Sequence, residues 1–266
     1  FLIILKLEKN MRLAGKTAII TGAGSGIGRA TAQKYADQGA FVICAGLSKK
    51  SNDDTLKLII SKGGQGSSRE LDVTDSQMIE KFFSDIFENY SKIDILINNA
   101  GQAVIGDATE ISKTDWERQM DVNLTSIYSM SRAIWAHFRE NGGGVILNTA
   151  SIAGLIGTPG QVSYGVSKAG VVMATKCMAL DGAKDNIRVN CVCPGWVQTP
   201  MVDYHLAQLD DPKAFKDRLR RLHPLGEGNT NDIAAGFIYL GSDEARWITG
   251  IALTIDGGLT CGLVPD

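Results

Sequence analysis

A tyrosine and a lysine stand four residues apart in Tyr164-Gly-Val-Ser-Lys168. On a helix, residues with this spacing share one face, with Cβ atoms roughly 5–6 Å apart. A phenol ordinarily titrates at about pH 10, and a nearby cation lowers that pKa because it favours the phenolate. A tyrosine shifted toward neutrality can exchange a proton with the oxygen of an alcohol or carbonyl. The pair therefore predicts acid–base chemistry at an oxygen, and an ordinary solvated Tyr–Lys pair is the alternative that the spacing leaves open.

Two further polar residues precede this pair in the chain. Ser151 stands just past the apolar run Gly144–Thr149, which predicts a buried strand, so its hydroxyl can face the same crevice as Tyr164. Asn123 falls inside a helix predicted over residues 114–140 and broken once, where asparagine is a poor helix former. The alternatives are a turn serine and an exposed helix asparagine. No histidine is placed beside a serine elbow, which argues against a Ser-His-Asp triad.

A glycine-rich loop, Gly22-Ala-Gly-Ser-Gly-Ile-Gly28, lies between a strand predicted over Lys16–Thr21 and a helix predicted over Gly26–Gln38. Free backbone N–H groups and the positive end of the helix dipole favour a phosphate at such a junction. The missing side chains also let a pyrophosphate approach the backbone. The pattern matches neither G-x-G-x-x-G nor the P-loop. A purely structural glycine turn is therefore the alternative to a phosphate site.

Short apolar runs alternate with amphipathic segments along the whole chain. The other predicted strands are Ala40–Ala45, Ser67–Asp72, Ile93–Asn98, Ile187–Cys193 and Ile251–Asp256, and the other predicted helices cover residues 53–62, 76–90, 162–182 and 231–241. This alternation predicts an α/β fold with one doubly wound parallel sheet of about seven strands in a single domain.

Ligands of open parallel sheets bind outside the carboxyl ends of the strands. Small and polar residues follow each predicted strand at that edge. Gly46-Leu-Ser48 follows the second strand, Asp72-Val73 the third, Asn98-Asn-Ala-Gly101 the fourth and Pro194-Gly-Trp-Val-Gln-Thr199 the sixth. The sequence therefore predicts that these segments meet the glycine loop and Ser151 around one ligand.

Composition excludes several other classes of protein. With 27 Lys+Arg against 29 Asp+Glu, the net charge of −2 does not indicate a nucleic-acid partner. The apolar run over residues 1–5 is too short to span a membrane and lacks signal-peptide features. The 5 cysteines and 3 histidines do not cluster, so we expect no metal site and a reducing, cytoplasmic location.

The domain boundaries follow from the same pattern. We expect one domain over residues 11–266, preceded by an N-terminal extension, residues 1–10, whose native origin is left open. The polar and irregular connection Val197–Asn229 is long for a compact domain, and such connections are usually functional. We therefore predict a substrate lid over residues 197–229.

Taken in order, T-G-x-x-x-G-x-G, N-N-A-G, Asn123, Ser151, Y-x-x-x-K and P-G resemble the motifs of short-chain dehydrogenases/reductases, over residues 12–258. The resemblance implies a Rossmann-type sheet, a nicotinamide cofactor and hydride transfer to or from a carbonyl carbon. Tyr164 then resembles the general acid/base and Ser151 the residue that hydrogen-bonds the substrate oxygen. Lys168 resembles the residue that lowers the pKa of the tyrosine and holds the nicotinamide ribose, and Asn123 the residue that positions a water in the proton relay.

The same resemblance implies the cofactor-binding positions. Besides Tyr164 and Lys168 they are Gly22, Ser25, Gly26, Ile27, Gly28, Leu47, Ser48, Asp72, Val73, Asn98, Ala100, Gly101, Pro194, Gly195, Val197 and Thr199.

The end of the second strand bears on the choice between NAD and NADP. Members that prefer NAD carry an acidic residue where this chain has Gly46, and members that prefer NADP often carry an arginine where it has Leu47. Ser48, Lys49 and Lys50 could receive a 2′-phosphate, so we favour NADP slightly. The alternative is that both lysines are solvated residues leading into a helix.

We therefore expect an NAD(P)-dependent oxidoreductase that interconverts a small secondary alcohol and a ketone. The family also implies a homotetramer. The second candidate is an enzyme like 3-oxoacyl-(acyl-carrier-protein) reductase, weakly favoured by Arg218, Arg220 and Arg221, because the carrier is acidic. From a different class, a nicotinamide-cofactor sensor without turnover would need only the binding half of the Asn–Ser–Tyr–Lys set.

Overall fold

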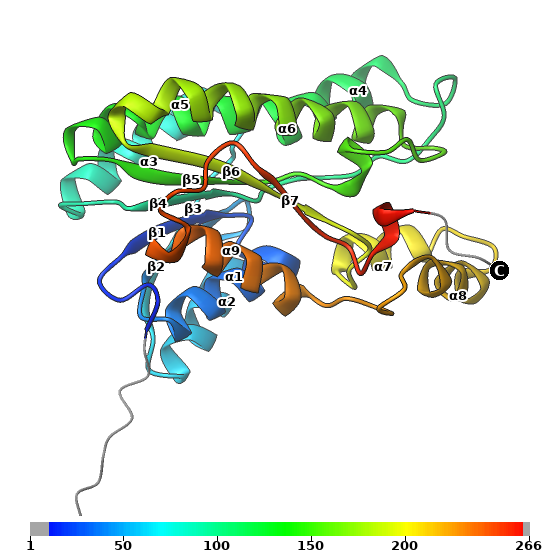
Figure 1. Ribbon diagram of the computed structural model, residues 1–266, viewed down its shortest axis with the longest axis horizontal. Helices are drawn as coiled ribbons and strands as arrows, with labels where there is room; N and C mark the ends of the chain where they lie inside the picture. The colour runs from blue at the N-terminus through cyan, green and yellow to red at the C-terminus, as the bar shows by residue number, and fades with distance from the viewer. Residues whose placement is uncertain (1–10, 263–266) are drawn as a thin grey trace, which may run out of the picture.

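The computed structural model describes residues 11–262, so the predicted N-terminal extension lies outside the described residues. One seven-stranded sheet has the order β3-β2-β1-β4-β5-β6-β7, and all neighbouring strands are parallel (Figure 1). The strands are β1 (Thr17–Thr21), β2 (Phe41–Gly46), β3 (Gln65–Glu70), β4 (Ile95–Asn98), β5 (Gly144–Thr149), β6 (Ile187–Pro194) and β7 (Ala252–Ile255). The first six strands have the order of the Rossmann fold, which confirms the predicted fold class.

Helices cover both faces of the sheet. One face carries α1 (Gly26–Asp37), α2 (Lys49–Ser61) and α9 (Thr230–Gly241), and the other carries α3 (Ser76–Asn89), α4 (Lys113–Met120), α5 (Ser126–Glu140) and α6 (Val162–Gly182) (Figure 1). The central strand β1 is therefore buried on both sides. Ala18 and Ile20 pack in the core beneath α1 and α9, whereas Ile19 packs against side chains of α3 and α5. This two-sided burial explains why the central strands are almost continuously apolar.

Several elements begin or end differently from the prediction. Helix α2 starts at Lys49 rather than Asp53, because the Ser48 hydroxyl accepts a hydrogen bond from Ser51 N at 3.2 Å and caps the helix. The expected break in the long helix is a π-helical segment, Asp121–Thr125, between α4 and α5. A sequence pattern predicts that a helix is interrupted, but it does not distinguish a π segment from a turn.

We predicted that the connection after β6 is irregular, and this prediction is wrong. The connection contains α7 (Pro200–Leu206) and α8 (Pro212–Leu222), each of which starts with proline after a capping Thr199 or Asp211. A cap followed by proline at the first helical position is a known start signal, so the sequence did carry this information. No helix in the described range is long and apolar enough to cross a membrane.

Candidate active site

Two adjoining hollows lie at the carboxyl ends of the strands, and we call them the inner pocket and the outer cleft. Of the predicted positions, the inner pocket is lined by Gly22, Ser25, Gly26, Ile27, Ala100, Gly101, Ser151, Tyr164, Lys168, Pro194, Gly195, Val197 and Thr199. The outer cleft is lined by Leu47, Ser48, Asp72 and Val73, and it shares Gly22, Ser25, Ala100 and Gly101 with the inner pocket. Segments separated by up to 183 residues in the chain, from Gly22 to His205, thus meet around two adjoining pockets that share residues.

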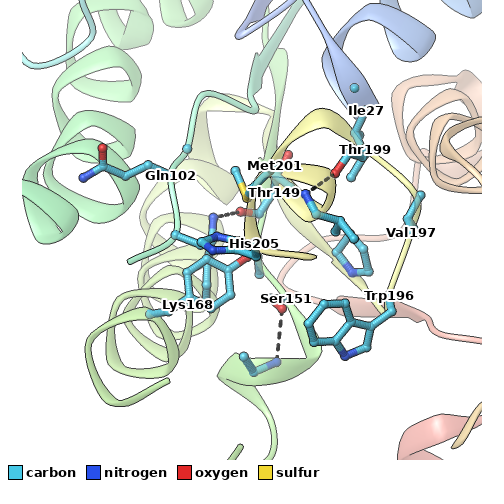
Figure 2. Close-up of a pocket in the computed structure, with 18 of the residues that line it drawn as sticks. Ile27, Gln102, Thr149, Ser151, Lys168, Trp196, Val197, Thr199, Met201 and His205 are labelled. Atoms are coloured by element: carbon cyan, nitrogen blue, oxygen red, sulfur yellow. Dashed lines mark hydrogen bonds between the residues drawn. The ribbon is translucent and has the colours of Figure 1, made fainter. Parts of the chain in front are cut away.

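Ser151, Tyr164 and Lys168 come together in the inner pocket. Ser151 caps the short turn Ile152–Gly154, where its hydroxyl accepts a hydrogen bond from Ala153 N at 3.1 Å, and it lines the pocket together with Tyr164, which lies in the first turn of α6. One turn further along α6, the Lys168 ammonium lies 5.7 Å from the centre of the Tyr164 ring. It donates a hydrogen bond to the Thr149 carbonyl at 2.8 Å (Figure 2). The structure therefore holds a hydroxyl, a phenol and an ammonium in fixed positions around the same space.

Burial dominates the ionisation of this pair. It raises the pKa of Tyr164 above its ordinary value, and the hydrogen bond from Ser151 only partly opposes that rise. Burial also lowers the pKa of Lys168 to about 8. The direction for Tyr164 is opposite to the one that the Tyr–Lys spacing predicted. The reason is that the ammonium lies over the ring and is bonded to Thr149, while Lys168 is buried and Tyr164 is partly removed from water.

The lowered pKa of Lys168 predicts a stability that rises in alkali. Between about pH 8 and its ordinary pKa of 10.5, this lysine is neutral in the folded chain and still protonated in the unfolded chain. The folded state therefore gains stability as pH rises through that window, by roughly 3 kcal/mol. Lys168→Met removes the titration. Urea unfolding at a series of pH values should show the wild type gaining stability relative to Lys168→Met across this range.

Lys176→Met is the matched control, because Lys176 lies on the same helix and is exposed. Its stability should follow the wild-type pH dependence. Parallel curves for the wild type and Lys168→Met would contradict a buried, easily deprotonated Lys168.

Asn123 does not line the inner pocket, but it holds the backbone of Gln102, which does. Within the π segment its side chain accepts a hydrogen bond from Gln102 N and donates one to Gln102 O, both at 2.9 Å, and it donates a third to Ser167 Oγ at 3.1 Å. A Cβ atom on Gly101 would lie 3.3 Å from the Asn123 amide oxygen and 3.6 Å from Lys168 Nζ. Asn123 thus joins the loop after β4 to α6, close to Lys168. Such π segments are frequent at functional sites.

The glycine loop packs too tightly for side chains. Gly22 has φ of +64°, and a Cβ atom on it would lie 3.0 Å from Ala100 Cα. A Cβ atom on Gly28 would lie 2.2 Å from the Gly22 carbonyl oxygen. Gly28 lines neither the inner pocket nor the outer cleft. Its role is instead to let α1 begin directly behind the loop, which leaves the N-terminus of α1 facing the hollow.

Asn98 is a predicted site residue whose side chain lies elsewhere. It is buried in the sheet and donates to Asn148 Oδ1 at 2.9 Å. The next residue, Asn99, lines the inner pocket and donates from its side chain to the Thr21 carbonyl at 3.1 Å. Successive residues of a strand point to opposite faces, so a motif with two asparagines does not say which of them faces the ligand.

At the end of β2, the two lysines are engaged in ion pairs. Lys49 contacts Asp53 and donates to Ser68 Oγ at 3.0 Å, and Lys50 lies 3.1 Å from Asp54. Leu47 and Ser48 face the outer cleft. The lysines are therefore held by carboxylates of α2, and none of the residues that line the cleft directly after β2, Gly46, Leu47 and Ser48, is acidic.

Several side chains that complete the inner pocket were not predicted from the sequence. They are Trp196, Met201, Val202 and His205 on the connection after β6, with Ile105, Ile152 and Gln161 on the other sides. Figure 2 shows Trp196, Met201 and His205 around the same space as Ser151. For Met201, Val202 and His205, the available signal was their position in the predicted lid, residues 197–229. Within residues 11–262 no group of three or more metal-binding side chains is assembled.

Comparisons with known proteins agree with this geometry. A family model described as Enoyl-(Acyl carrier protein) reductase matches residues 22–260. The chain is 38% identical over 250 residues to 3-oxoacyl-[acyl-carrier-protein] reductase FabG of Thermotoga maritima, which covers 94% of this chain and 99% of that protein. A crystal structure of a short-chain type dehydrogenase/reductase from Mycobacterium marinum matches with a TM-score of 0.89 and 32% identity, over 95% of this chain and 98% of that one. A crystal structure with bound NADP, from Agrobacterium tumefaciens, matches with a TM-score of 0.86 and 32% identity, over 96% and 100% of the two chains.

Proposed function

Because this chain belongs to the short-chain dehydrogenase/reductase family, it is an NAD(P)-dependent oxidoreductase that interconverts a secondary alcohol and a ketone, and we propose that Ser151, Tyr164 and Lys168 perform its chemistry. The observation that carries the proposal is that Ser151, Tyr164 and the buried Lys168 line the same pocket, with Lys168 Nζ 5.7 Å from the centre of the Tyr164 ring. These groups line one pocket with the glycine loop, so a substrate oxygen and a dinucleotide could be held together.

In reduction, the hydroxyls of Ser151 and Tyr164 donate hydrogen bonds to the substrate carbonyl oxygen, and Tyr164 then transfers its proton to that oxygen. With its pKa raised above the ordinary value, the phenol of Tyr164 is protonated at neutral pH, so a proton is available for transfer. The Lys168 ammonium stabilises the phenolate that remains. A bound nicotinamide supplies the hydride in reduction and accepts it in oxidation. In oxidation, the phenolate of Tyr164 takes the proton from the alcohol.

The residues present fit a dinucleotide. The glycine loop ends at the N-terminus of α1, where backbone N–H groups and the helix dipole favour a diphosphate. A Cβ atom is excluded at Gly22, and Gly26 has φ of +50°, so the backbone in this cradle is bare. Asp72 and Val73 line the outer cleft at the end of β3, where an adenine would lie. Lys168 and Asn99 remain at the nicotinamide end, in the inner pocket.

We propose that NADP is preferred over NAD. The support is the absence of an acidic side chain at Gly46, Leu47 and Ser48, where a carboxylate would repel a 2′-phosphate. Both lysines are already paired with Asp53 and Asp54, so the preference we expect is modest.

Ser48→Asp tests this preference. Aspartate caps a helix as well as serine does, so α2 should keep its start while the cleft gains a negative charge. We expect the NADPH dissociation constant to rise about 10-fold or more and the NADH constant to rise much less, as measured by fluorescence titration. Ser48→Asn, which also caps helices but adds no charge, separates size from charge. Equal losses for both cofactors in Ser48→Asp would contradict a 2′-phosphate near this residue.

The substrate class has two candidates. A general secondary alcohol/ketone pair suits the inner pocket, whose walls include Ile105, Ile152 and Met201. A 3-oxoacyl thioester on an acidic carrier is the second candidate, since the relative from Thermotoga maritima carries that name. Its structural support is the exposed Arg218 and Arg221 on α8, whereas Arg220 is paired with Glu227 at 3.1 Å.

The deciding experiment is a titration with NADH and NADPH, followed by a carbonyl panel monitored at the nicotinamide absorbance band. The panel should contain a 3-oxoacyl thioester and simple cyclic and linear ketones. Turnover of at least one ketone supports the proposed function. Tight cofactor binding without turnover of any carbonyl would instead favour the cofactor sensor.

We further propose that residues 11–266 form one domain with residues 197–229 as its lid, and that the chain assembles as a homotetramer. Large apolar side chains support the assembly: Leu180 on α6 is 81% exposed, and Trp247, just before β7, is 95% exposed. We propose the cytoplasm as its location. Cys44, Cys191 and Cys193 are free and buried, as thiols in a reducing compartment are.

A further inference from the structure

His223 is a buried histidine outside the set of residues that lines the inner pocket. It follows α8 directly and is only 5% exposed. The imidazole fills the space between the ends of two strands: a Cβ atom on Gly195, after β6, would lie 3.0 Å from His223 Nε2. Gly257, after β7, packs against its other side, since a Cβ atom there would lie 3.5 Å from His223 Cβ. The side chain therefore connects the lid to the carboxyl edge of the sheet.

The hydrogen bonds of His223 define a single protonation state. Nε2 accepts a hydrogen bond from the Trp196 backbone N–H at 3.2 Å, so it carries no proton. Nδ1 lies 2.6 Å from the Leu219 carbonyl oxygen, which can only accept, so Nδ1 is the protonated nitrogen. The ring is thus a neutral imidazole that accepts from the segment after β6 and donates to the last turn of α8.

A pairing of His223 with the nearby Asp256 would give the ring a different role. The carboxylate oxygens of Asp256 instead accept hydrogen bonds from Gly258 N at 3.0 Å, Thr260 N at 2.8 Å and Thr260 Oγ1 at 2.6 Å. This carboxylate is committed to its own turn. The hydrogen bonds of His223 are directed at Trp196 and Leu219, and they do not form a carboxylate–histidine dyad.

Trp196 links His223 to the inner pocket, because its backbone N–H bonds to His223 and it lines that pocket. The Trp196 side chain lines the inner pocket together with Ser151 (Figure 2). Its ring also meets Phe215 of α8 edge-to-face, with ring centres 5.4 Å apart. The lid therefore holds Trp196 at two points, by its backbone through His223 and by its ring through Phe215.

We propose that His223 is a positioning residue that holds Trp196 as the substrate-facing wall of the inner pocket and couples this wall to lid helix α8. The proposal rests on the proposed function, because it assigns substrate binding to the inner pocket. His223 does not touch the reacting atoms, and its loss weakens substrate binding more than it slows the chemical step.

Two substitutions separate the two hydrogen bonds of the ring. His223→Gln places an amide oxygen near the position of Nε2 and can still accept from Trp196 N–H. His223→Asn is shorter, so it can still donate to the Leu219 carbonyl but loses the acceptor. With a ketone that the wild type reduces, we expect His223→Asn to raise KM about 5- to 10-fold with kcat within about twofold of wild type, and His223→Gln to restore KM to within about twofold.

A double-mutant cycle with Trp196→Ala tests whether the increase in KM caused by His223→Asn depends on the Trp196 side chain. Without the indole ring there is no wall to misplace, so His223→Asn should raise KM by less than about twofold in that background. The proposal is overturned if His223→Asn leaves KM unchanged, if His223→Gln is as impaired as His223→Asn, or if the increase in KM is the same without Trp196.

A second measurement requires neither turnover nor a folded variant at position 223. In wild-type protein labelled with ¹⁵N, the ring nitrogens of the 3 histidines can be assigned by His137→Gln and His205→Gln. We expect His223 to show a protonated Nδ1 and an unprotonated Nε2 at pH 7.5. A protonated Nε2 would overturn the proposal, whatever the carbonyl panel gives. A panel without turnover would instead count against the proposed function, while this spectrum still reports on His223.

Discussion

Replacing Tyr164 with phenylalanine should lower kcat by about 10²- to 10⁴-fold, because the phenol is the proposed proton donor and acceptor. The change removes one oxygen atom from a half-buried side chain on the first turn of α6, and the ring should keep its place beside Lys168. Cofactor binding should therefore survive. Steady-state kinetics with the best ketone of the panel and fluorescence titration with NADPH measure the two effects separately.

Tyr128→Phe is the matched control for this substitution. Tyr128 is exposed on α5 and lies far along the chain from the motif, so the same loss of an oxygen atom should leave kcat within about twofold. Activity of Tyr164→Phe close to that of the wild type would show that another group moves the proton. A parallel loss of cofactor affinity in Tyr164→Phe would show that the phenol mainly holds the nucleotide.

Replacing Gly28 with alanine should disable cofactor binding and destabilise the fold. The added Cβ atom would lie 2.2 Å from the Gly22 carbonyl oxygen and 2.5 Å from the Asn99 side-chain nitrogen. Neither neighbour can move freely, because one is backbone and the other donates a hydrogen bond to the Thr21 carbonyl at 3.1 Å. We expect a loss of about 1–3 kcal/mol in the free energy of unfolding. A cofactor dissociation constant at least about 10-fold higher should accompany it, since the loop must shift.

Gly157→Ala provides the matched control, because a Cβ atom at Gly157 would meet nothing within 4 Å. Urea unfolding and cofactor titration of both variants separate a general effect of losing a glycine from the steric effect of this position. Wild-type affinity in Gly28→Ala would mean that the loop tolerates the shift. The role assigned to its packing against Asn99 would then be wrong.

The direction in which the pKa of Tyr164 is shifted affects how readily this residue donates and accepts a proton. With a raised pKa, the phenol of Tyr164 stays protonated at neutral pH but donates its proton less readily than an ordinary phenol, and its phenolate would be a stronger base. Reduction therefore also depends on the Lys168 ammonium, which stabilises the phenolate left when Tyr164 donates its proton. In oxidation, the ammonium of Lys168, present below about pH 8, must stabilise the phenolate.

Much of the fold was readable from local patterns. The helix predicted over residues 162–182 coincides with α6, and the strand predicted over residues 144–149 coincides with β5. Both succeed because apolar periodicity and a glycine or polar boundary act over a few residues. The meeting of the glycine loop, Ser151 and Tyr164 was also predictable, because every parallel strand delivers its carboxyl end to the same edge.

Other features depended on neighbours that are distant in the chain. The sequence does not say that Asn99 rather than Asn98 faces the pocket, because the choice depends on the register of β4 against β5. It does not say that Lys49 is held by Asp53 and Ser68, because Ser68 comes from a different element.

Residue types, spacing and the alternation of strands and helices were enough to determine the family, the sheet and the set of candidate chemical groups. The packed structure decided which side chains face the pocket, the raised pKa of Tyr164 and the link from His223 to Trp196. The physical reason is that chemical identity and local periodicity are properties of short segments. Burial, hydrogen-bond partners and electrostatic environment are set by atoms brought together from the whole chain.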